Sequence, residues 1–301
     1  MLVHTTVLLH ESIDSLNILP GKTYLDGTLG SGGHALLALQ KAGGDLTVIG
    51  LDRDEDALRR SRKRLEEVAT DRTHLHLVLS SYGDLDLALK TLHIETIDAM
   101  MLDLGLSSDQ FETSGRGFSF KKDEPLLMTF AEKPDEHDLT AAYILNTWEE
   151  KSIADVIYGY GEERYALRIA RKIVAYRERK KIETTHELVE IIQSAVPSSY
   201  RHGRIHPATR TFQALRITVN DELNTLKDGL KKGFERLSKG GRMAVISFHS
   251  LEDRIVKHFN KEKADAELAV LITKKPVTPN DEELENNPRS RSAKLRIIEK
   301  N

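Results

Sequence analysis

The chain has 301 residues, of which 39% are hydrophobic and 30% charged, and its formal net charge is −3. This is the profile of a folded chain long enough for about two domains, so any nucleic-acid binding has to come from local basic patches. The chain contains no cysteine, which excludes disulfides, thiolate metal sites, iron–sulfur clusters and cysteine nucleophiles. Its apolar runs are far shorter than the roughly 18 residues of a membrane span, and its first residues lack the features of a secretion signal. We therefore expect a cytoplasmic protein without a membrane partner.

Between residues 22 and 103, short β-rich runs alternate with helix-like segments. The expected strands are 23–26, 46–52, 75–79 and 97–102, and the expected helices are 34–42, 54–69 and 85–92. Strands separated by single helices form right-handed βαβ units, in which the strands run parallel and helices cover both faces of the sheet. This part of the chain therefore predicts a doubly wound, mostly parallel α/β domain.

The alternation breaks after Ser108. Residues 111–134 show no regular pattern, and helix-like segments follow at 139–146, 149–158, 163–179 and 185–195. The α/β pattern resumes with a long amphipathic helix at 211–237, closed by Gly240 and Gly241, then a strand at 242–248, a helix at 251–259 and strands at 268–273 and 294–298. The acidic segment 281–287 is expected to be a solvated loop. We therefore predict a discontinuous α/β domain, residues 1–110 and 209–301, interrupted by a smaller α-helical domain at 111–208 that recognises the substrate.

Four glycines stand within seven positions, from Gly27 to Gly33, between the first expected strand and the first expected helix. Glycine tolerates the positive φ of such a turn and lets backbone amides approach a ligand closely. Asp52 ends the next strand, where a carboxylate can accept hydrogen bonds from a ribose. A plain tight turn would use the same glycines, but the loop and the acid together favour an adenosine-type cofactor.

The loop alone leaves two cofactor classes open. Residues 30–35 fit the fingerprint G-x-G-x-x-G/A, which favours a nicotinamide- or flavin-dependent enzyme. Asp26, just before the glycines, favours instead the acid-x-G-x-G-x-G loop of Rossmann-like S-adenosylmethionine (SAM) methyltransferases, which the chain resembles except for Thr28 at the first of those glycines. After the third strand, Tyr82 stands where a ring could stack on an adenine or simply pack. Asp103 ends the fourth strand, at the edge where open α/β sheets bind ligands.

Segments 103–110 (DLGLSSDQ) and 115–120 (GRGFSF) resemble the bacterial ribosomal RNA small-subunit methyltransferase H family, which methylates cytosine N4 in 16S rRNA. Further matching stretches lie at 4–9, 26–34, 160–164, 206–216, 247–254 and 288–292. The resemblance implies a class I SAM-dependent methyltransferase fold with an inserted helical domain, and SAM as the cofactor. It places the SAM contacts on Gly32, Gly33, His34, Asp52, Tyr82, Asp103 and Gln110. At 127–131, where relatives carry Asp-Met-Arg-Met-Asp, this chain reads Leu-Met-Thr-Phe-Ala, which puts a substrate contact there in doubt.

The absence of cysteine also bears on the target atom. Methylation of cytosine carbon 5 normally needs a cysteine adduct, so the exocyclic amine remains as the target. Because the lone pair of this amine is delocalised into the ring, an enzyme has to align it with the methyl donor and accept a hydrogen bond from its N–H. We expect the loop 103–108 to supply such acceptors, with Asp103 as the catalytic residue and Ser107 as a substrate contact. The alternative is that Asp103 only holds the cofactor.

Residues 164–181 carry eight basic side chains against one acid, among them Arg168 and Arg171, which favours a phosphate-contacting helix, although a solvated amphipathic face has the same spacing. A second cationic cluster contains His206 and Arg210. Arg116, in the GRGFSF segment, and His249, at a strand end on the ligand edge, are the other candidate substrate contacts, and a structural role for His249 is an equal alternative. The spacing of the twelve histidines gives little support to a metal site, and we expect none.

The sequence thus predicts SAM-dependent methylation of cytidine N4 in 16S rRNA at the decoding centre, with the small ribosomal subunit as partner. Two alternatives stay open: a nicotinamide-dependent oxidoreductase, and a SAM-binding RNA assembly factor with weakened catalysis. A homodimer also stays open, because the sequence does not determine the oligomeric state.

Overall fold

The computed structural model describes residues 6–105, 114–130 and 138–301. Within these residues the strands form one seven-stranded sheet in the order β3-β2-β1-β4-β5-β7-β6. They are β1 (Lys22–Asp26), β2 (Leu46–Asp52), β3 (His74–Leu79), β4 (Ile97–Asp103), β5 (Leu237–Ser247), β6 (Ala269–Leu271) and β7 (Lys294–Lys300). β1 to β5 pair in parallel, whereas β7 is antiparallel to β5 and β6. The strand order reverses between β1 and β4, and such a reversal is where open α/β sheets bind their ligands.

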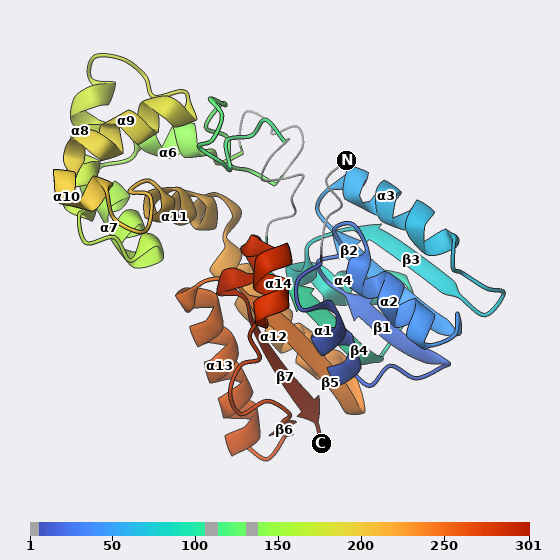
Figure 1. Cartoon of the computed structure of the whole chain (residues 1–301). Helices are drawn as coiled ribbons and strands as arrows, with labels where there is room; N and C mark the ends of the chain where they lie inside the picture. The colour runs from blue at the N-terminus through green and yellow to red at the C-terminus, as the bar shows by residue number, and fades with distance from the viewer. Residues whose placement is uncertain (1–5, 106–113, 131–137) are drawn as a thin grey trace. The chain divides into compact units, whose positions relative to one another are not determined.

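Helices cover both faces of this sheet (Figure 1). Successive side chains of a strand point to opposite faces, and those of the central strands are buried on both. On β4, Ala99 and Met101 pack in one layer with α2 (Gly33–Lys41) and α3 (Glu55–Glu66). Met100 and Leu102 pack in the opposite layer with α4 (Leu85–Thr91) and α12 (Glu222–Arg236). The other elements around the sheet are α1 (Leu9–Ser15), η1 (Tyr82–Asp84), α13 (Ser250–Asp265), α14 (Asp281–Asn286) and η2 (Pro288–Ser292). The predicted doubly wound α/β fold is confirmed.

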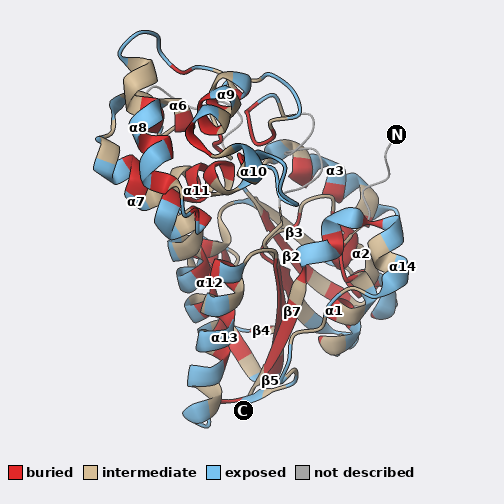
Figure 2. Cartoon of the chain, turned by 60° about the vertical axis from the view of Figure 1, so that its left-hand side comes forward, coloured by how far each residue is buried: buried red, intermediate tan, exposed pale blue. Residues whose placement is uncertain are grey.

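A second group of helices has a core of its own (Figure 2). It consists of α6 (Ala141–Thr147), α7 (Glu150–Gly161), α8 (Ala166–Arg177), α9 (Thr185–Ala195), α10 (Ser198–Arg201) and α11 (Thr209–Asn220). Their apolar faces meet around Ile144, Ile157 and Ile169, which are fully buried. At the start of α9, Thr184 and Glu187 form a capping box, in which each side chain accepts a hydrogen bond from the other residue's backbone N–H. Among the described helices of the chain, none is both long and apolar enough to span a membrane.

The chain divides into two compact units, one formed by Met1–Gly105 and Leu223–Asn301 and the other by Leu106–Glu222. The sequence predicted a single helix over 211–237, but α11 ends at Asn220 and α12 begins at Glu222. The break arises at Asp221, whose backbone is left-handed with φ 47°. As a result α11 groups with the helical unit, whereas the sequence interpretation assigned residues 209–222 to the resumed α/β domain.

Two other local expectations were wrong. Gly240 and Gly241 do not terminate a helix, because α12 ends at Arg236 and the two glycines lie within β5. Gly240 has φ 74°, so the strand bends there in a way that favours glycine. The acidic segment expected as a loop forms α14, where Asn280 caps the helix by accepting a hydrogen bond from the Glu283 N–H at 2.8 Å.

Candidate cofactor and active site

β1 ends at Asp26, which is 1% exposed and anchors the start of the glycine loop. Its two carboxylate oxygens accept hydrogen bonds from the Thr28 N–H and the Tyr24 hydroxyl, each at 3.1 Å. Burial raises the pKa of Asp26 to about 7, because the charged form loses its hydration. Asp26 therefore fixes the backbone at the start of the glycine loop through its hydrogen bond with the Thr28 N–H.

Thr28 stands at the position where the loop departs from the pattern acid-x-G-x-G-x-G. Its hydroxyl oxygen accepts a hydrogen bond from the backbone N–H of Asp103 at 2.6 Å. The neighbouring Gly27 donates its N–H to the Met101 carbonyl at 2.9 Å. These two bonds join the glycine loop to the end of β4. Threonine thus supplies a contact here that glycine could not make.

Asp52 ends β2 and also holds the glycine loop, through the backbone of Gly30. Its Oδ2 accepts a hydrogen bond from the Gly30 N–H at 2.7 Å, and its Oδ1 accepts one from the Asp54 N–H at 2.9 Å. Burial raises the pKa of Asp52, and these backbone hydrogen bonds act in the opposite direction. A carboxylate has about four lone-pair positions, so Asp52 can still accept hydrogen bonds from a ligand's hydroxyl groups.

The first turn of α2 follows directly. Gly32 is its N-cap with φ 76°, and Gly33 packs so closely on Thr6 that an added Cβ would lie 1.9 Å from the threonine Oγ1. The His34 side chain is 5% exposed, with Nε2 3.2 Å from the Val7 carbonyl oxygen. The imidazole therefore belongs to the core. The N-terminus of a helix carries a partial positive charge, so this turn suits an anionic ligand group.

Tyr82 lies in η1, after β3, and is half-buried. An added Cβ at Gly229 of α12 would lie 2.5 Å from Cδ2 of the Tyr82 ring, and one at Gly27 would lie 2.9 Å from the Tyr82 Cβ. The side chain is thus wedged between the glycine loop and α12. This contact is the packing role that the sequence left open beside adenine stacking.

Asp103 is the last residue of β4, where the strand order reverses. Its Oδ1 accepts a hydrogen bond from the Gly105 N–H at 3.2 Å. Burial raises the pKa of Asp103 to about 7, the Gly105 bond lowers it, and the negative charges of Asp26 and Glu252 raise it further. A carboxyl group with this pKa, at the ligand edge of the sheet, can accept a proton near neutral pH.

His249 precedes α13 and is its N-cap. Its Nδ1 accepts a hydrogen bond from the Glu252 N–H at 3.4 Å, and its Nε2 lies 3.1 Å from the Glu252 Oε1. Glu252 is 3% exposed and also accepts the Phe248 N–H at 2.8 Å. The imidazole is therefore turned toward its own helix, which favours the structural alternative.

Glu252 was missed by the sequence analysis, although its negative charge acts on Asp103. The signal was present in the sequence: His249 and Glu252 have the spacing of a capping box, in which the fourth residue folds back on the first. The ring of Phe248 lies against the backbone just after Asp103, because an added Cβ at Gly105 would lie 2.8 Å from its Cε2.

Two predicted substrate contacts, Arg116 and His206, lie in the helical unit and differ in exposure. Arg116 is 8% exposed; its Nη1 donates to the Phe130 carbonyl at 2.7 Å, and its guanidinium lies 5.5 Å from the Phe118 ring centroid. His206 stacks on Phe120, with ring centroids 4.5 Å apart, and burial lowers its pKa. Arg116 thus has a structural role, whereas His206 as a whole residue remains exposed.

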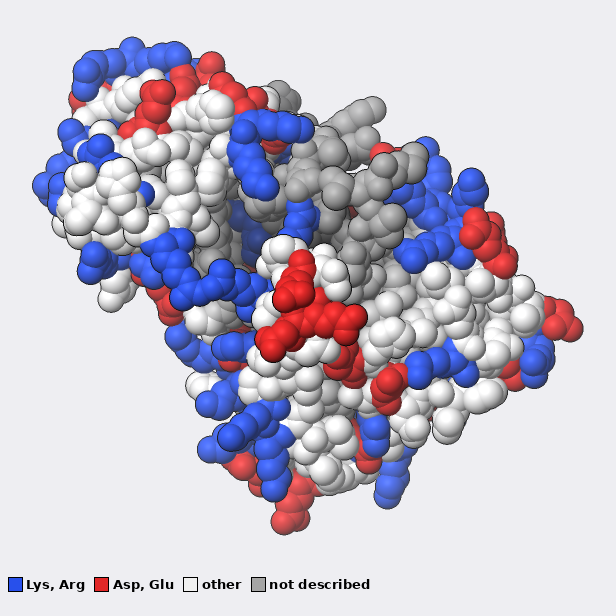
Figure 3. Space-filling model, viewed as in Figure 1, with Lys and Arg blue, Asp and Glu red and all other residues white. Residues whose placement is uncertain are grey.

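Exposed cations follow α8 of the helical unit. Arg168 lies 5.6 Å from the Tyr165 ring centroid, and the Nε of Arg171 lies 3.7 Å from the Glu150 Oε1. Both arginines are exposed, and their pairings at the surface are weak enough to exchange for a phosphate. Figure 3 shows Lys and Arg side chains spread over the visible face of this unit.

Arg210 is less accessible than the cations of α8. Its Nη1 donates to the Tyr200 hydroxyl at 3.2 Å and lies 4.0 Å from the Oε2 of Glu163, a fully buried carboxylate. The Tyr200 hydroxyl also donates to that same Oε2. Arg210 therefore offsets the negative charge of the buried Glu163, and without Arg210 that charge would lack its nearby cation.

The structure thus brings the glycine loop, Asp52 and Asp103 together at the carboxyl edge of the sheet, with Tyr82 beside them. Ser107 and Gln110, predicted to contact substrate and SAM, lie outside the described residues.

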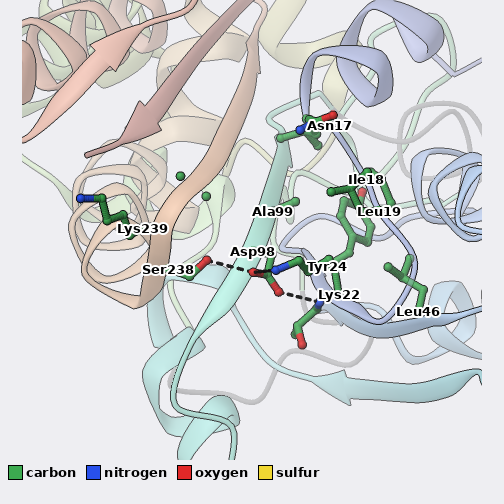
Figure 4. Close-up of a pocket in the computed structure, with 14 residues that line it drawn as sticks. Asn17, Ile18, Leu19, Lys22, Tyr24, Leu46, Asp98, Ala99, Ser238 and Lys239 are labelled. Carbon is green, nitrogen blue, oxygen red and sulfur yellow. Dashed lines mark hydrogen bonds and ion pairs between the residues drawn. The ribbon is translucent and has the colours of Figure 1, made fainter.

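A pocket of about 130 Å³ lies at the opposite edge, between the amino ends of the strands (Figure 4). Asp98 in its wall accepts hydrogen bonds from Thr23, Lys22 and Ser238 at 3.0, 3.2 and 2.9 Å. Burial alone would raise the pKa of Asp98, but these bonds lower it. They join the starts of β1, β4 and β5, so we assign Asp98 a structural role.

Comparison with known proteins gives the family. The model of the MraW methylase family matches residues 1–301. A protein named ribosomal RNA small subunit methyltransferase H from Sulfurihydrogenibium sp. is 46% identical over 297 residues, which cover 99% of each chain. A protein of the same name from Synechococcus elongatus is 48% identical over 298 residues, covering 99% of this chain and 94% of that one. Membership of a methylase family decides between the two cofactor classes, and the nicotinamide alternative is wrong. The chain therefore belongs to the MraW methylase family and is an S-adenosylmethionine-dependent methyltransferase.

Proposed function

We propose that this enzyme methylates the exocyclic N4 of a cytidine in 16S rRNA, at the decoding centre of the small ribosomal subunit. The names of its relatives support ribosomal RNA of the small subunit as the substrate. The observation that carries the choice of an amine is Asp103, a hydrogen-bond acceptor fixed at the reversal of the strand order and bonded to the glycine loop through Thr28.

Asp103 suits the chemistry of an aromatic amine. When bound, SAM supplies an electrophilic methyl group on a sulfonium. The N4 lone pair is delocalised into the cytosine ring, so the amine becomes nucleophilic as its N–H is polarised by an acceptor. In this proposal the Asp103 carboxylate accepts that hydrogen bond, orients the amine, and takes the N4 proton as positive charge develops on the nitrogen.

The residues around the loop fit SAM by their chemistry. The Asp52 carboxylate would accept hydrogen bonds from the ribose hydroxyls. The first turn of α2, with Gly32, Gly33 and His34, would lie against the carboxylate of the methionine end, which the positive end of the helix dipole favours. Tyr82 would border the adenine, and Asp103 would be shared between the donor and the reacting amine. Gln110, the remaining predicted SAM contact, lies outside the described residues.

Replacement of Asp52 by alanine tests the donor site. Loss of hydrogen bonds to a charged acceptor is expected to weaken SAM binding about 10- to 100-fold, measured by titration calorimetry. Asp54→Ala is the matched control, because Asp54 caps α3 with its side chain, so its loss costs stability rather than donor affinity. Equal SAM affinity in Asp52→Ala and the wild type would contradict the assignment.

The segment that departs from the relatives, 127–131, packs inside the helical unit as far as it is described. Met128 is fully buried with φ 55°, and its N–H donates to the Arg116 carbonyl at 2.7 Å. Its carbonyl accepts a hydrogen bond from the Asn220 Nδ2 at 2.7 Å. Because these residues serve packing, we propose that the enzyme turns over despite the lost charges. SAM binding without methyl transfer to small subunits would favour the assembly factor instead.

The exposed cations of α8 are the proposed RNA contacts. The double variant Arg168→Glu, Arg171→Glu is expected to lower RNA affinity at least about tenfold and to reduce the slope of log affinity against log salt by about 1 per lost phosphate contact. Filter binding over a salt series measures both. Lys151→Glu, an exposed charge reversal on α7 of the same unit, is the control for a charge change away from α8, although it changes the net charge by half as much as the double variant. An unchanged salt slope in the double variant would place the RNA elsewhere.

One experiment tests substrate and reaction together. Mass mapping of modified nucleotides in 16S rRNA, from cells with and without this protein, is expected to show one N4-methylcytidine that depends on it. In vitro, transfer of labelled methyl from SAM to naked 16S rRNA and to assembled subunits distinguishes the two substrates. We propose the assembled subunit in the cytoplasm, because a structured RNA has to be held while one base is unstacked. Methylation of carbon 5 instead of N4 would overturn the proposal.

A further inference from the structure

A short N-terminal segment, Thr6–Leu8, lies against the first turn of α2. The contact with Thr6 is so close that Gly33 has no room for a side chain. One residue on, the Val7 carbonyl meets the His34 imidazole at 3.2 Å. The turn proposed to bind the methionine end of SAM is therefore packed directly against residues 6–8.

The path of this segment depends on an unusual backbone conformation at Leu8. Leu8 precedes α1 with φ 48° and ψ 40°, a left-handed conformation that non-glycine residues rarely adopt. Its side chain is fully buried in the same core cluster as Leu29 of the glycine loop and Ala35 of α2. A strained residue of this kind persists only where its surroundings hold it in place.

The backbone of Leu8 is held by a residue from the other end of the chain. Its N–H donates to the Glu283 Oε1 at 2.8 Å. Glu283 is half-buried on α14, which lies beside α1 (Figure 1). The Asn287 N–H caps the end of α14 by donating to the Glu283 carbonyl at 2.7 Å, and Asn287 is at the same time the N-cap of η2. The buried Ser290 hydroxyl donates in turn to the Asn287 carbonyl at 2.8 Å.

We infer that Glu283 is a positioning residue for SAM binding: it holds residues 6–8 against the first turn of α2 and so fixes the position of that turn in the donor site. This inference rests on the donor site proposed above. It also gives the segment 288–292, singled out in the sequence, a role, since η2 connects α14 to β7 and so sets the place of Glu283.

The test compares SAM affinity and kinetics in variants of α14. Glu283→Ala removes the acceptor, and we expect the Kd and KM for SAM to rise about tenfold, with kcat at saturating SAM within about twofold of the wild type. Glu283→Gln keeps an amide oxygen that can accept the Leu8 N–H, so it is expected to restore most of the affinity. Glu282→Ala, at an exposed neighbouring position on the same helix, is expected to change neither constant.

Loss of stability alone is separated from loss of positioning by Asp98→Ala, which breaks hydrogen bonds at the far edge of the same sheet. It is expected to lower the Tm without changing the SAM Kd. In Glu283→Ala, hydrogen exchange should also accelerate in residues 6–15 and stay unchanged in β7. Should Glu283→Ala not fold, Asn280→Ala weakens the cap of α14 and is expected to raise the Kd two- to fivefold.

The outcomes distinguish this inference from the donor site on which it rests. If Asp52→Ala weakens SAM binding and Glu283→Ala lowers only the Tm, the inference is wrong and the donor site stands. If neither variant changes the Kd, the donor site is wrong and the inference falls with it. A fall in kcat with unchanged KM would also overturn the inference, because it would place Glu283 in the chemistry.

Discussion

Replacing Asp103 with asparagine is expected to lower the single-turnover rate of methyl transfer about 10²- to 10³-fold at saturating SAM. The magnitude is that of removing one preorganised electrostatic contact to a developing charge. Asparagine has nearly the same shape and can keep an oxygen toward the Gly105 N–H, so the loop should stay in place. Quenched-flow measurement with excess enzyme separates this chemical step from binding.

The pH dependence of the single-turnover rate tests whether the ionised form of Asp103 is the active one. Burial raises the pKa of Asp103 to about 7, so the carboxyl group is protonated below that value and ionised above it. If the ionised form is the acceptor, the wild-type rate rises about tenfold per pH unit below pH 6 and levels off above about pH 8. The Asp103→Asn rate should lack this rise. A variant that loses SAM affinity but reaches the wild-type rate at saturation would reject the catalytic role and leave Asp103 as a cofactor ligand.

Replacing Gly161 with alanine is expected to destabilise the helical unit by about 3 kcal/mol, the upper part of the usual range for an overpacked core. Gly161 ends α7, where an added Cβ would lie 2.5 Å from the carbonyl oxygen and 3.1 Å from the carbonyl carbon of Arg210 on α11. These are backbone atoms and cannot rotate away, so the two helices would have to separate. Calorimetric unfolding of the whole chain measures the loss.

Gly159 provides the matched control, two residues earlier on the same helix. Nothing lies within 4 Å of an added Cβ at this position, so Gly159→Ala is expected to stabilise the protein by about 0.5–1 kcal/mol through helix propensity. The two substitutions thus have opposite predicted signs for the same chemical change. If both destabilised the unit equally, the close approach of α7 and α11 would not be the reason for glycine at 161.

Local sequence patterns predicted the central strands well. β2 occupies residues 46–52 as expected, because a parallel strand buried on both faces is a continuous apolar run bounded by turns. The start of β5 could not be predicted in the same way. Leu237 joins the sheet by pairing with Ile97, with a register shift before the next pair, and this pairing connects residues 140 positions apart. Likewise, aspartate tolerates the left-handed backbone seen at Asp221 but does not require it, so the sequence does not predict that the long amphipathic pattern divides there.

In the candidate site, the sequence predicted the positions of residues better than the directions of their side chains. An acid at the end of a parallel strand is placed by the fold, so Asp52 and Asp103 lie at the predicted edge. The two histidines depend instead on partners. His34 is turned into the core by the Val7 carbonyl, and His249 toward its own helix by Glu252. A sequence pattern gives the position of such a residue but not the direction in which its side chain points.

The insertion has a consequence for how the protein is made. β4 and β5 pair Met101 with Ala244, so the sheet cannot close until the helical unit has been synthesised. At about 5–20 residues per second, the tip of β4 is made roughly 7–30 s before its partner. Over that interval β4 presents a bare apolar edge on the ribosome, while the inserted helices, with a core of their own, can already fold. The nascent chain is therefore most exposed to aggregation midway through translation, and this is when chaperones have most to protect.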